Sequence, residues 1–124
     1  MSEPIVFISH FKIKEGKLDG FKQLSQKVTE QIKANKPGTV VFLQYFNDEG
    51  TELSIIHVFP DAASYDRHGE GVVERAKAAL EFIEPTRREL YGTPSDQALA
   101  MTRPPDGSGI TFNHKPQLNV GYIR

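Results

Sequence analysis

The sequence predicts an α+β domain in which helices cover an antiparallel sheet. Strands are indicated by three stretches rich in β-branched and aromatic residues, PIVFISHFKIK, TVVFLQYFN and TELSIIHVFP. Between the first two, apolar residues from Leu18 to Ile32 recur every three or four positions, which indicates an amphipathic helix. These changes of period within 124 residues predict one domain with a sheet and a helical layer.

The first half of the chain predicts a strand, a helix and a hairpin, in that order. The first strand covers residues 4–14, because Pro4 is tolerated at the start of a strand. The helix runs from Lys17 to Asn35 and ends at NKPG, since proline and glycine cannot continue it. Strands over residues 39–47 and 51–60 are joined by NDEG, a loop of a favoured hairpin length.

The second half of the chain predicts helical segments followed by a fourth strand. Asp61 is placed to cap a short helix that ends at His68. After GEG, helical spacing resumes over residues 72–83 and is closed by Pro85. The stretch TRRELYG then alternates in the manner of a strand. The resulting order β-α-β-β-α-β is that of the ferredoxin-like fold, with an antiparallel sheet.

We assign residues 1–92 to this ferredoxin-like core and residues 93–124 to a C-terminal extension of the same domain, or an arm that reaches a second copy. The extension begins with PSDQALAM, which predicts a short helix capped by Ser95 or Asp96. The pieces ITFN and LNVGYIR predict short extended segments.

Composition excludes several classes of function. The chain has no cysteine, so disulfides, thiolate metal sites and cysteine nucleophiles are absent. Its net charge is −1, with acids and bases interspersed, which is not the pattern of a nucleic-acid-binding surface. No signal peptide and no apolar run of membrane-spanning length is visible. We therefore expect a cytoplasmic protein that binds neither nucleic acid nor a membrane.

The central strands are apolar on both faces, although the predicted helices cover only one of them. The segments IVFI, VVFL and SIIHVF would expose a patch on the other face. Burying about 600 Å² of this patch would contribute roughly 15 kcal/mol before the costs of association. The extension has too few large apolar residues to cover it, so we expect a homodimer with the two sheets face to face.

Two longer stretches resemble a known family. A first strand meets a K-x-G-K-x-x-x-F helix entry in IVFISHFKIKEGKLDGFKQL, and a third strand precedes Asp61 and His68 in SIIHVFPDAASYDRHGEG. Together with the element order over residues 4–92, they resemble the antibiotic biosynthesis monooxygenase superfamily of dimeric α/β barrels. The resemblance implies a pocket between sheet and helices. Some members oxidise phenols or quinols there with O2, and they use no metal or flavin.

The resemblance also implies candidate site residues. A histidine would accept the proton of the substrate hydroxyl, since imidazole titrates near neutral pH. His68 matches the family's histidine after strand three, and His57 lies within that strand, so these two are the predicted catalytic residues. The predicted substrate contacts are Tyr65, His10, Tyr45 and Phe42. We expect His10 beside His57, because each lies equally far into neighbouring strands taken as parallel. The predicted ligand is a small aromatic molecule, with no cofactor and no metal.

Each candidate also has a purely structural interpretation. His57 and His10 can be satisfied histidines of the core or of a dimer contact, and His68 can stabilise a helix C-terminus. The aromatic candidates can be core residues, and His114 in FNHKP is expected at the surface. A metal set of His10, His57 and Glu89 has little support, because no H-x-x-x-H spacing accompanies it.

Three functions therefore stay open after the sequence is read. The first is a cofactor-independent oxygenase, which we take as the main hypothesis. The second is a stress-response or ligand-binding member of the same barrel group without catalysis. The third is haem binding. The absence of tryptophan counts against the first function and more strongly against the third, because some monooxygenase members and the haem-degrading members use that residue in the pocket.

Overall fold

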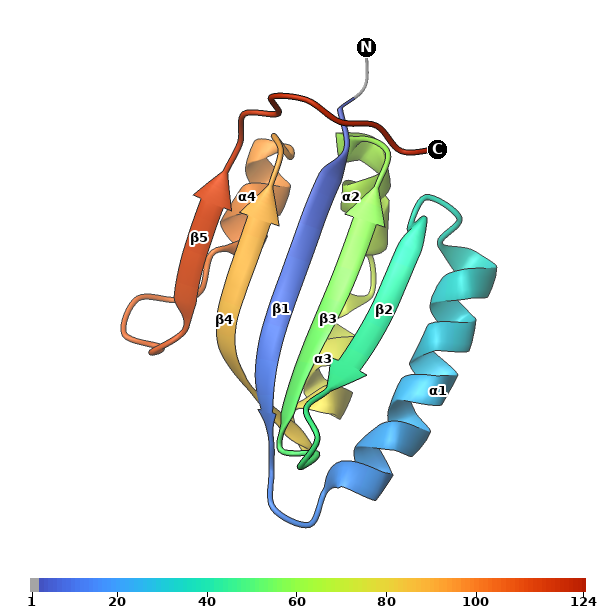
Figure 1. The fold of residues 1–124 in the computed structure, drawn as a ribbon, viewed down its shortest axis with the longest axis vertical. Coiled ribbons are helices and arrows are strands. Elements are labelled where there is room, and N and C mark those ends of the chain that lie inside the picture. Colours follow the sequence, from blue (N-terminus) through green and yellow to red (C-terminus); the bar gives the residue numbers. More distant parts are fainter. Residues whose placement is uncertain (1–2) are drawn as a thin grey trace.

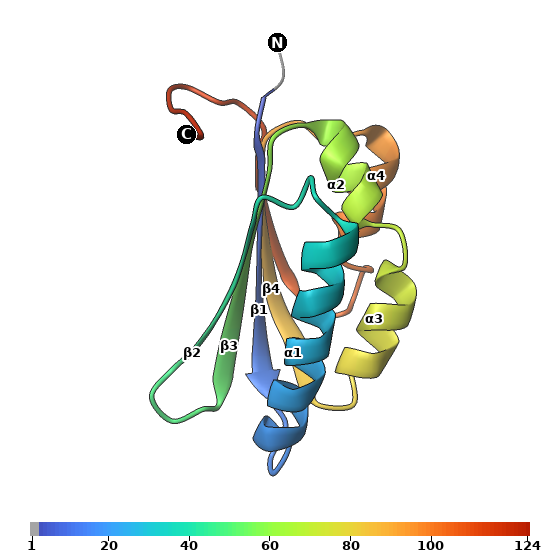
Figure 2. The ribbon, with the colours of Figure 1, turned by 90° about the vertical axis from the view of Figure 1, so that its right-hand side faces the viewer.

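Residues 3–124, which the computed structural model describes, form one sheet with its helices packed on a single face (Figures 1 and 2). The elements in chain order are β1 Ile5–Ile13, α1 Leu18–Asn35, β2 Val41–Phe46, β3 Glu52–Phe59, α2 Ala62–His68, α3 Val72–Ala79, β4 Ile83–Tyr91, α4 Asp96–Thr102 and β5 Thr111–Lys115. The strand order is β2-β3-β1-β4-β5. The first four strands confirm the predicted ferredoxin-like α+β fold, and β5 adds a parallel edge that makes the sheet mixed.

The central pair β1 and β3 is antiparallel, so the expected parallel pairing is wrong. In the observed register Phe7 lies opposite His57, and His10 lies opposite Ser54. Strand β3 forms a hairpin with β2 and is antiparallel to both of its neighbours, β2 and β1. Side chains alternate between the faces of a strand, so His10 and His57 point to opposite sides of the sheet. The expectation that these two histidines lie side by side is therefore also wrong.

The helix predicted over residues 72–83 ends earlier than its apolar spacing suggested. Helix α3 stops at Ala79, and Ile83 opens β4 opposite Ile13. Ile83 is 2% exposed, so the strand conformation carries it into the core. Pro85 is tolerated within β4 because the register with β1 shifts next to Phe11, its partner.

The core lies between the sheet and the helices in two adjoining clusters. One contains Ile5, Phe59, Tyr65 and Leu90, and the other contains Phe21, Leu53 and Ile83. The first anchors α2 to β1, β3 and β4, because Tyr65 of α2 is buried together with the strand residues. At its start α2 is capped as predicted, since the Asp61 carboxylate accepts a hydrogen bond from the Ser64 amide at 2.8 Å.

The C-terminal segment extends the sheet rather than covering its outer face. Helix α4 begins as predicted, with Ser95 accepting the Ala98 amide at 3.1 Å. Gly92 lets the chain turn from β4 toward α4. Glycine is needed here because the φ of Gly92 is 101° and a Cβ would lie 2.7 Å from the Pro4 carbonyl oxygen. After β5 the chain forms no further strand and crosses the upper end of the sheet (Figure 1). No helix within residues 3–124 is long and apolar enough to cross a bilayer.

Candidate functional site

The inner face of the sheet carries a buried histidine on β3. His57 is 7% exposed and lies between the aromatic rings of Phe7 and Phe42, with centroid distances of 5.5 and 5.1 Å. Its Nδ1 atom lies 3.1 Å from the carbonyl oxygen of Phe7. A carbonyl can only accept, so Nδ1 donates its hydrogen. The neutral ring therefore presents a lone pair at Nε2.

A second buried histidine faces His57 from the end of α2. His68 is also 7% exposed, and the two rings meet edge to face with centroids 5.0 Å apart. The Nδ1 atom of His68 is 2.8 Å from the hydroxyl of Thr39, in the connection between α1 and β2. The Arg75 guanidinium donates to the His68 carbonyl at 2.6 Å, which fixes the C-terminal end of α2.

Both imidazoles are neutral near pH 7. Burial lowers the pKa of His57 to about 4, against a smaller rise from its hydrogen bond to Phe7. Burial also lowers the pKa of His68 to about 3, followed by repulsion from His57 and from the Arg75 guanidinium. The two imidazoles therefore carry no charge of their own near pH 7, beside the guanidinium of Arg75.

The Nε2 atoms of the two rings have no hydrogen-bond partner within residues 3–124. No fully enclosed side-chain nitrogen or oxygen in that part of the chain lacks a partner. It follows that neither Nε2 atom is completely sealed from solvent, although both residues are buried. A hydroxyl group of a ligand could form a hydrogen bond with these atoms.

Tyr65 is connected to the histidine pair through the ring of Phe59, and its hydroxyl takes part in a buried hydrogen-bond network. Its ring contacts that of Phe59 with centroids 5.0 Å apart, and Phe59 is 5.1 Å from His68. Thr102 donates its hydroxyl hydrogen to the Ala98 carbonyl at 2.8 Å. The Tyr65 hydroxyl, 2.6 Å from the Thr102 oxygen, is therefore the donor in that contact. Burial raises the pKa of Tyr65, which keeps the phenol neutral.

The structure divides the predicted site residues between the two faces of the sheet. His57, His68, Tyr65 and Phe42 come together on the helix-covered face. His10 and Tyr45 lie on the outer face, where Tyr45 is 57% exposed. The metal set of His10, His57 and Glu89 does not form, because His57 is on the other side. Residues 3–124 contain no group of three or more His, Cys, Asp or Glu side chains that could hold a metal ion.

Four polar neighbours of this site were not predicted from the sequence. Thr39 and Arg75 contact His68. Thr102 forms a hydrogen bond with Tyr65. Arg88 donates to the carbonyl of Thr102 at 3.0 Å. Each comes from a different element or connection. No spacing pattern in one sequence links them. His114, expected at the surface, is half-buried on β5, and its Nε2 donates to the Gly92 carbonyl at 2.9 Å.

Solved structures share this fold across most of the chain. No family model and no curated protein matches the sequence. MupZ from Pseudomonas fluorescens has a TM-score of 0.72 at 23% identity, and the match covers 98% of this chain and 95% of MupZ. SnoaB, a cofactor-independent oxygenase from Streptomyces nogalater, has a TM-score of 0.62 at 18% identity, over 76% and 96% of the two chains.

A third match is a Caulobacter crescentus protein provisionally named as an antibiotic biosynthesis monooxygenase, with a TM-score of 0.64 at 17% identity. It covers 72% of this chain and 88% of its own length. This chain has the fold of the antibiotic biosynthesis monooxygenases. Within that group MupZ also matches the C-terminal extension, since its alignment leaves only 2% of this chain uncovered.

Proposed function

We propose that this protein oxidises a small phenol or quinol with O2 at its inner face, with His57 as the base and without a metal or flavin. The observation that carries the proposal is the fixed tautomer of His57. Its Nδ1 donates to Phe7, so the lone pair of Nε2 is available beside His68. The fold, which this chain has in common with the cofactor-independent oxygenase SnoaB, supports the same reaction class.

The chemistry begins with removal of the hydroxyl proton of the substrate by Nε2 of His57. The resulting phenolate is electron-rich and can pass an electron to O2, which the neutral phenol does far less readily. An imidazolium formed at His57 beside the new anion is an ion pair, and the low polarity of the surroundings strengthens that attraction. Neutral His68, 5.0 Å from His57 between ring centroids, does not oppose the transfer with a charge of its own.

The low pKa of His57 restricts the substrate. Each unit by which the pKa of the hydroxyl exceeds that of the base costs about 1.4 kcal/mol in the transfer. With a base whose pKa is about 4 in the empty site, an ordinary phenol is a poor substrate. We therefore propose substrates with an acidified hydroxyl, such as hydroxyquinones and quinols that carry electron-withdrawing groups. Phe42 and Tyr65 are the proposed ring contacts.

A second candidate, binding of a small aromatic molecule without catalysis, is favoured by the packing around the base. Phe7, Phe42 and Phe59 all lie with ring centroids within 6.1 Å of His57. These rings fill much of the volume that a substrate would need. A ligand would have to move at least one of these rings to reach the two Nε2 atoms.

Oxygen uptake with a panel of hydroxynaphthoquinones and quinols tests the proposal. We expect uptake by the unaltered protein and a fall of about a hundredfold in His57→Gln, the usual cost of losing a general base. His114→Gln is the matched control, because His114 also bonds a carbonyl but lies on β5. Uptake that is unchanged in His57→Gln would refute the assigned base. Ligand binding without any uptake would establish the second candidate instead.

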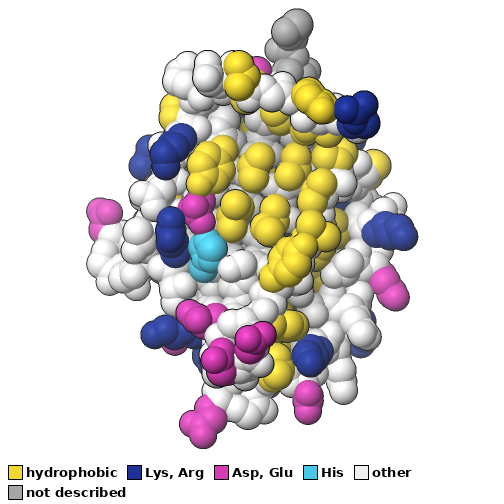
Figure 3. Space-filling view, viewed as in Figure 1, with side chains coloured by type: hydrophobic (Ala, Val, Ile, Leu, Met, Phe, Trp, Pro, Cys, Tyr) yellow, Lys and Arg dark blue, Asp and Glu magenta, His cyan; other side chains and the backbone are white. Residues whose placement is uncertain are grey.

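We also propose that the protein is a homodimer with its two sheets face to face. Figure 3 shows apolar side chains gathered over the outer face of the central strands. This apolar patch consists of Val6, Ile8, Val41, Leu43, Ile56 and Val58, which alternate with the inward residues of β1, β2 and β3. Its central row pairs Ile8, Ile56 and Leu43 across three strands. The C-terminal segment adds β5 at the sheet edge, so within residues 3–124 it leaves this patch open.

A further inference from the structure

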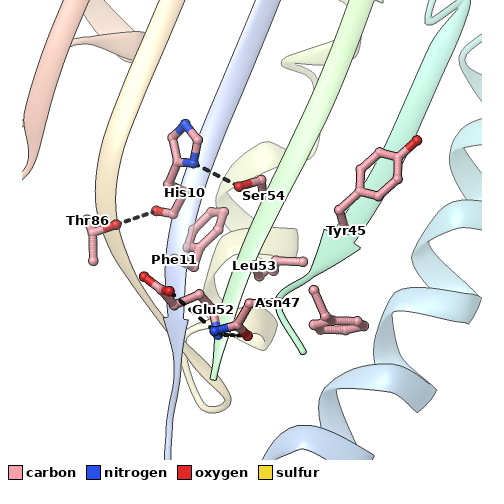
Figure 4. A pocket seen from close by; sticks show the side chains of 9 residues that line it. His10, Phe11, Tyr45, Asn47, Glu52, Leu53, Ser54 and Thr86 are labelled. Carbon is pink, nitrogen blue, oxygen red and sulfur yellow. Dashed lines mark hydrogen bonds between the residues drawn. The ribbon is translucent and has the colours of Figure 1, made fainter. Parts of the chain in front are cut away.

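A second array of polar side chains lies on the outer face of the sheet, opposite the histidine pair. The Nδ1 atom of His10 is 2.8 Å from the Ser54 hydroxyl, and its Nε2 atom is 2.5 Å from a carboxylate oxygen of Glu89. The three residues come from the adjacent strands β3, β1 and β4. Figure 4 shows the side chains of His10 and Ser54 pointing toward each other across two of these strands.

The hydrogen bonds of Glu89 determine which nitrogen of His10 carries the hydrogen. The second carboxylate oxygen of Glu89 accepts from the Tyr91 hydroxyl at 2.8 Å and lies 3.4 Å from the Arg87 guanidinium. The bonds from His10 and Tyr91 hold the pKa of Glu89 below its usual range, so it is an ionised acceptor. In neutral His10 the hydrogen is therefore on Nε2. The lone pair of Nδ1 faces the Ser54 hydroxyl.

The array opens into a groove beside the apolar patch. The groove has a volume of about 250 Å³, and His10 and Ser54 lie in its wall. Phe11, Tyr45 and Phe46 give it aromatic surfaces. Glu52 lies among its polar residues (Figure 4). It lies toward the end of the sheet that bears the β2–β3 turn, whereas the apolar patch occupies the opposite half.

We infer that Ser54, His10 and Glu89 form an acyl-transfer site that accepts small, uncharged esters of aromatic alcohols. A hydroxyl nucleophile, a base within hydrogen-bond reach and a third group that orients the base are the parts such a site needs. The aromatic walls suit the ring of the alcohol. The carboxylates of Glu52 and Glu89 disfavour an anionic ester.

The proposed reaction is the hydrolysis of an ester by water in two steps. The Ser54 oxygen forms a bond to the carbonyl carbon, the bond from that carbon to the alcohol oxygen breaks, and His10 carries the serine proton to the departing alkoxide. A water molecule, deprotonated by His10, then attacks the acyl-serine. The serine oxygen takes back a proton and a carboxylic acid is released.

The position of Ser54 limits the rate of this reaction. Ser54 lies within a strand that is paired on both sides, so its backbone belongs to two ladders and offers no free amide to the carbonyl oxygen of the ester. One such donor is typically worth about a hundredfold to a thousandfold in rate. The site therefore requires an ester with a good leaving group, and we expect the acyl-enzyme to accumulate.

The test uses p-nitrophenyl acetate and the whole chain. We expect a burst of about one p-nitrophenolate per chain and an acetyl group on the peptide that contains Ser54, detected by mass spectrometry. Ser54→Ala should lose both the burst and the adduct. Glu89→Gln should slow acylation about tenfold or more and change its pH profile, because the orienting carboxylate is lost. Ser25→Ala, which removes a hydroxyl from α1, is the matched control and should keep the full burst.

Two outcomes would overturn the assignment. One is a burst that survives in Ser54→Ala with acetyl groups only on lysines. The other is turnover that is lost in His10→Gln but kept in Ser54→Ala, because the imidazole would then act without the serine. If Ser54→Ala does not fold, Ser54→Cys keeps a nucleophile of similar size. It should carry the acetyl group at the substituted position, and an unmodified thiol there would equally refute the site.

Discussion

His57 Nδ1 donates to the carbonyl of Phe7, its cross-strand partner, and this hydrogen bond leaves Nε2 as the ring nitrogen that can accept a proton. The buried imidazole is neutral, and its free lone pair is directed away from the backbone of β1. The position of His57 on a central strand thus supports both the stability of the folded chain and the proposed chemistry.

The histidine pair should make the stability of the protein depend on pH. In the folded chain the pKa of His57 is about 4 and that of His68 about 3, whereas both are near 6.5 when unfolded. The unfolded chain then binds more protons, so stability is fully present above pH 6.5 and is lost as the pH falls toward 4. We expect a loss of up to about 1.4 kcal/mol per pH unit for each histidine in that interval.

Urea unfolding at pH 7, 6, 5 and 4 measures this effect. The matched comparison is a double variant, His57→Gln with His68→Gln, in which the free energy of unfolding should depend less on pH over the same interval. Equal unfolding free energies at pH 7 and pH 5 for the unaltered chain would contradict the proposed neutrality of the pair.

The buried hydroxyl pair of Tyr65 and Thr102 should stabilise the contact between α2 and α4. Tyr65→Phe and Thr102→Val each remove one partner of the 2.6 Å hydrogen bond. We expect each variant to lower the free energy of unfolding by about 1 kcal/mol or somewhat more. A double-mutant cycle by chemical denaturation should give a coupling energy between them. Strict additivity would mean that the bond contributes nothing to stability.

The first core cluster should tolerate truncation poorly. Phe59 is completely buried and contacts both Tyr65 and His68 through its ring. Phe59→Ala should cost about 3–5 kcal/mol in unfolding free energy, because a cavity is added to the lost burial. Val120→Ala, at a position that is 82% exposed, should change it by less than about 0.5 kcal/mol. Similar melting temperatures for both variants would argue against this description of the core.

The proposed dimer should depend on the central row of the apolar patch. Ile56 lies between Ile8 and Leu43, so Ile56→Lys places a charge where the partner sheet would pack. Sedimentation velocity should show two chains per particle for the unaltered protein and one for the variant. Val73→Lys, on the exposed side of α3, should remain a dimer. A single chain of 13.9 kDa in the unaltered sample would end the proposal.

The sequence was sufficient for the elements whose signals are local. The hairpin, the Asp61 cap, the Ser95 cap and the amphipathic stripe of α1 each depend on neighbouring residues, and all are found. The end of α3 was misplaced because apolar spacing continues through Ile83, which the strand β4 takes into the core. Apolar periodicity alone cannot show whether such a residue belongs to the helix or to the strand that follows it.

The candidate site was predicted less completely, for a related reason. The resemblance or the strand pattern points to Tyr65, His68 and Phe42, and the structure places them on one face of the sheet. Strand direction decides which side chains share a face, and the assumed parallel pairing placed His10 with His57. The partners Thr39, Thr102 and Arg88 come from a connection, a helix and a strand that are far apart in the sequence. Their contacts arise from tertiary folding and leave no periodic trace in the sequence.

The parallel strand β5 also affects how chains can aggregate. It contains only five residues and ends in Lys115, and it occupies the side of β4 that would otherwise be an open edge. Short, charged edge strands resist the addition of further strands, because a bare hydrogen-bonding edge is what nucleates fibrils. We therefore expect truncation before β5 to make the protein prone to amyloid-like association through β4, even though the four strands of the ferredoxin-like core would remain.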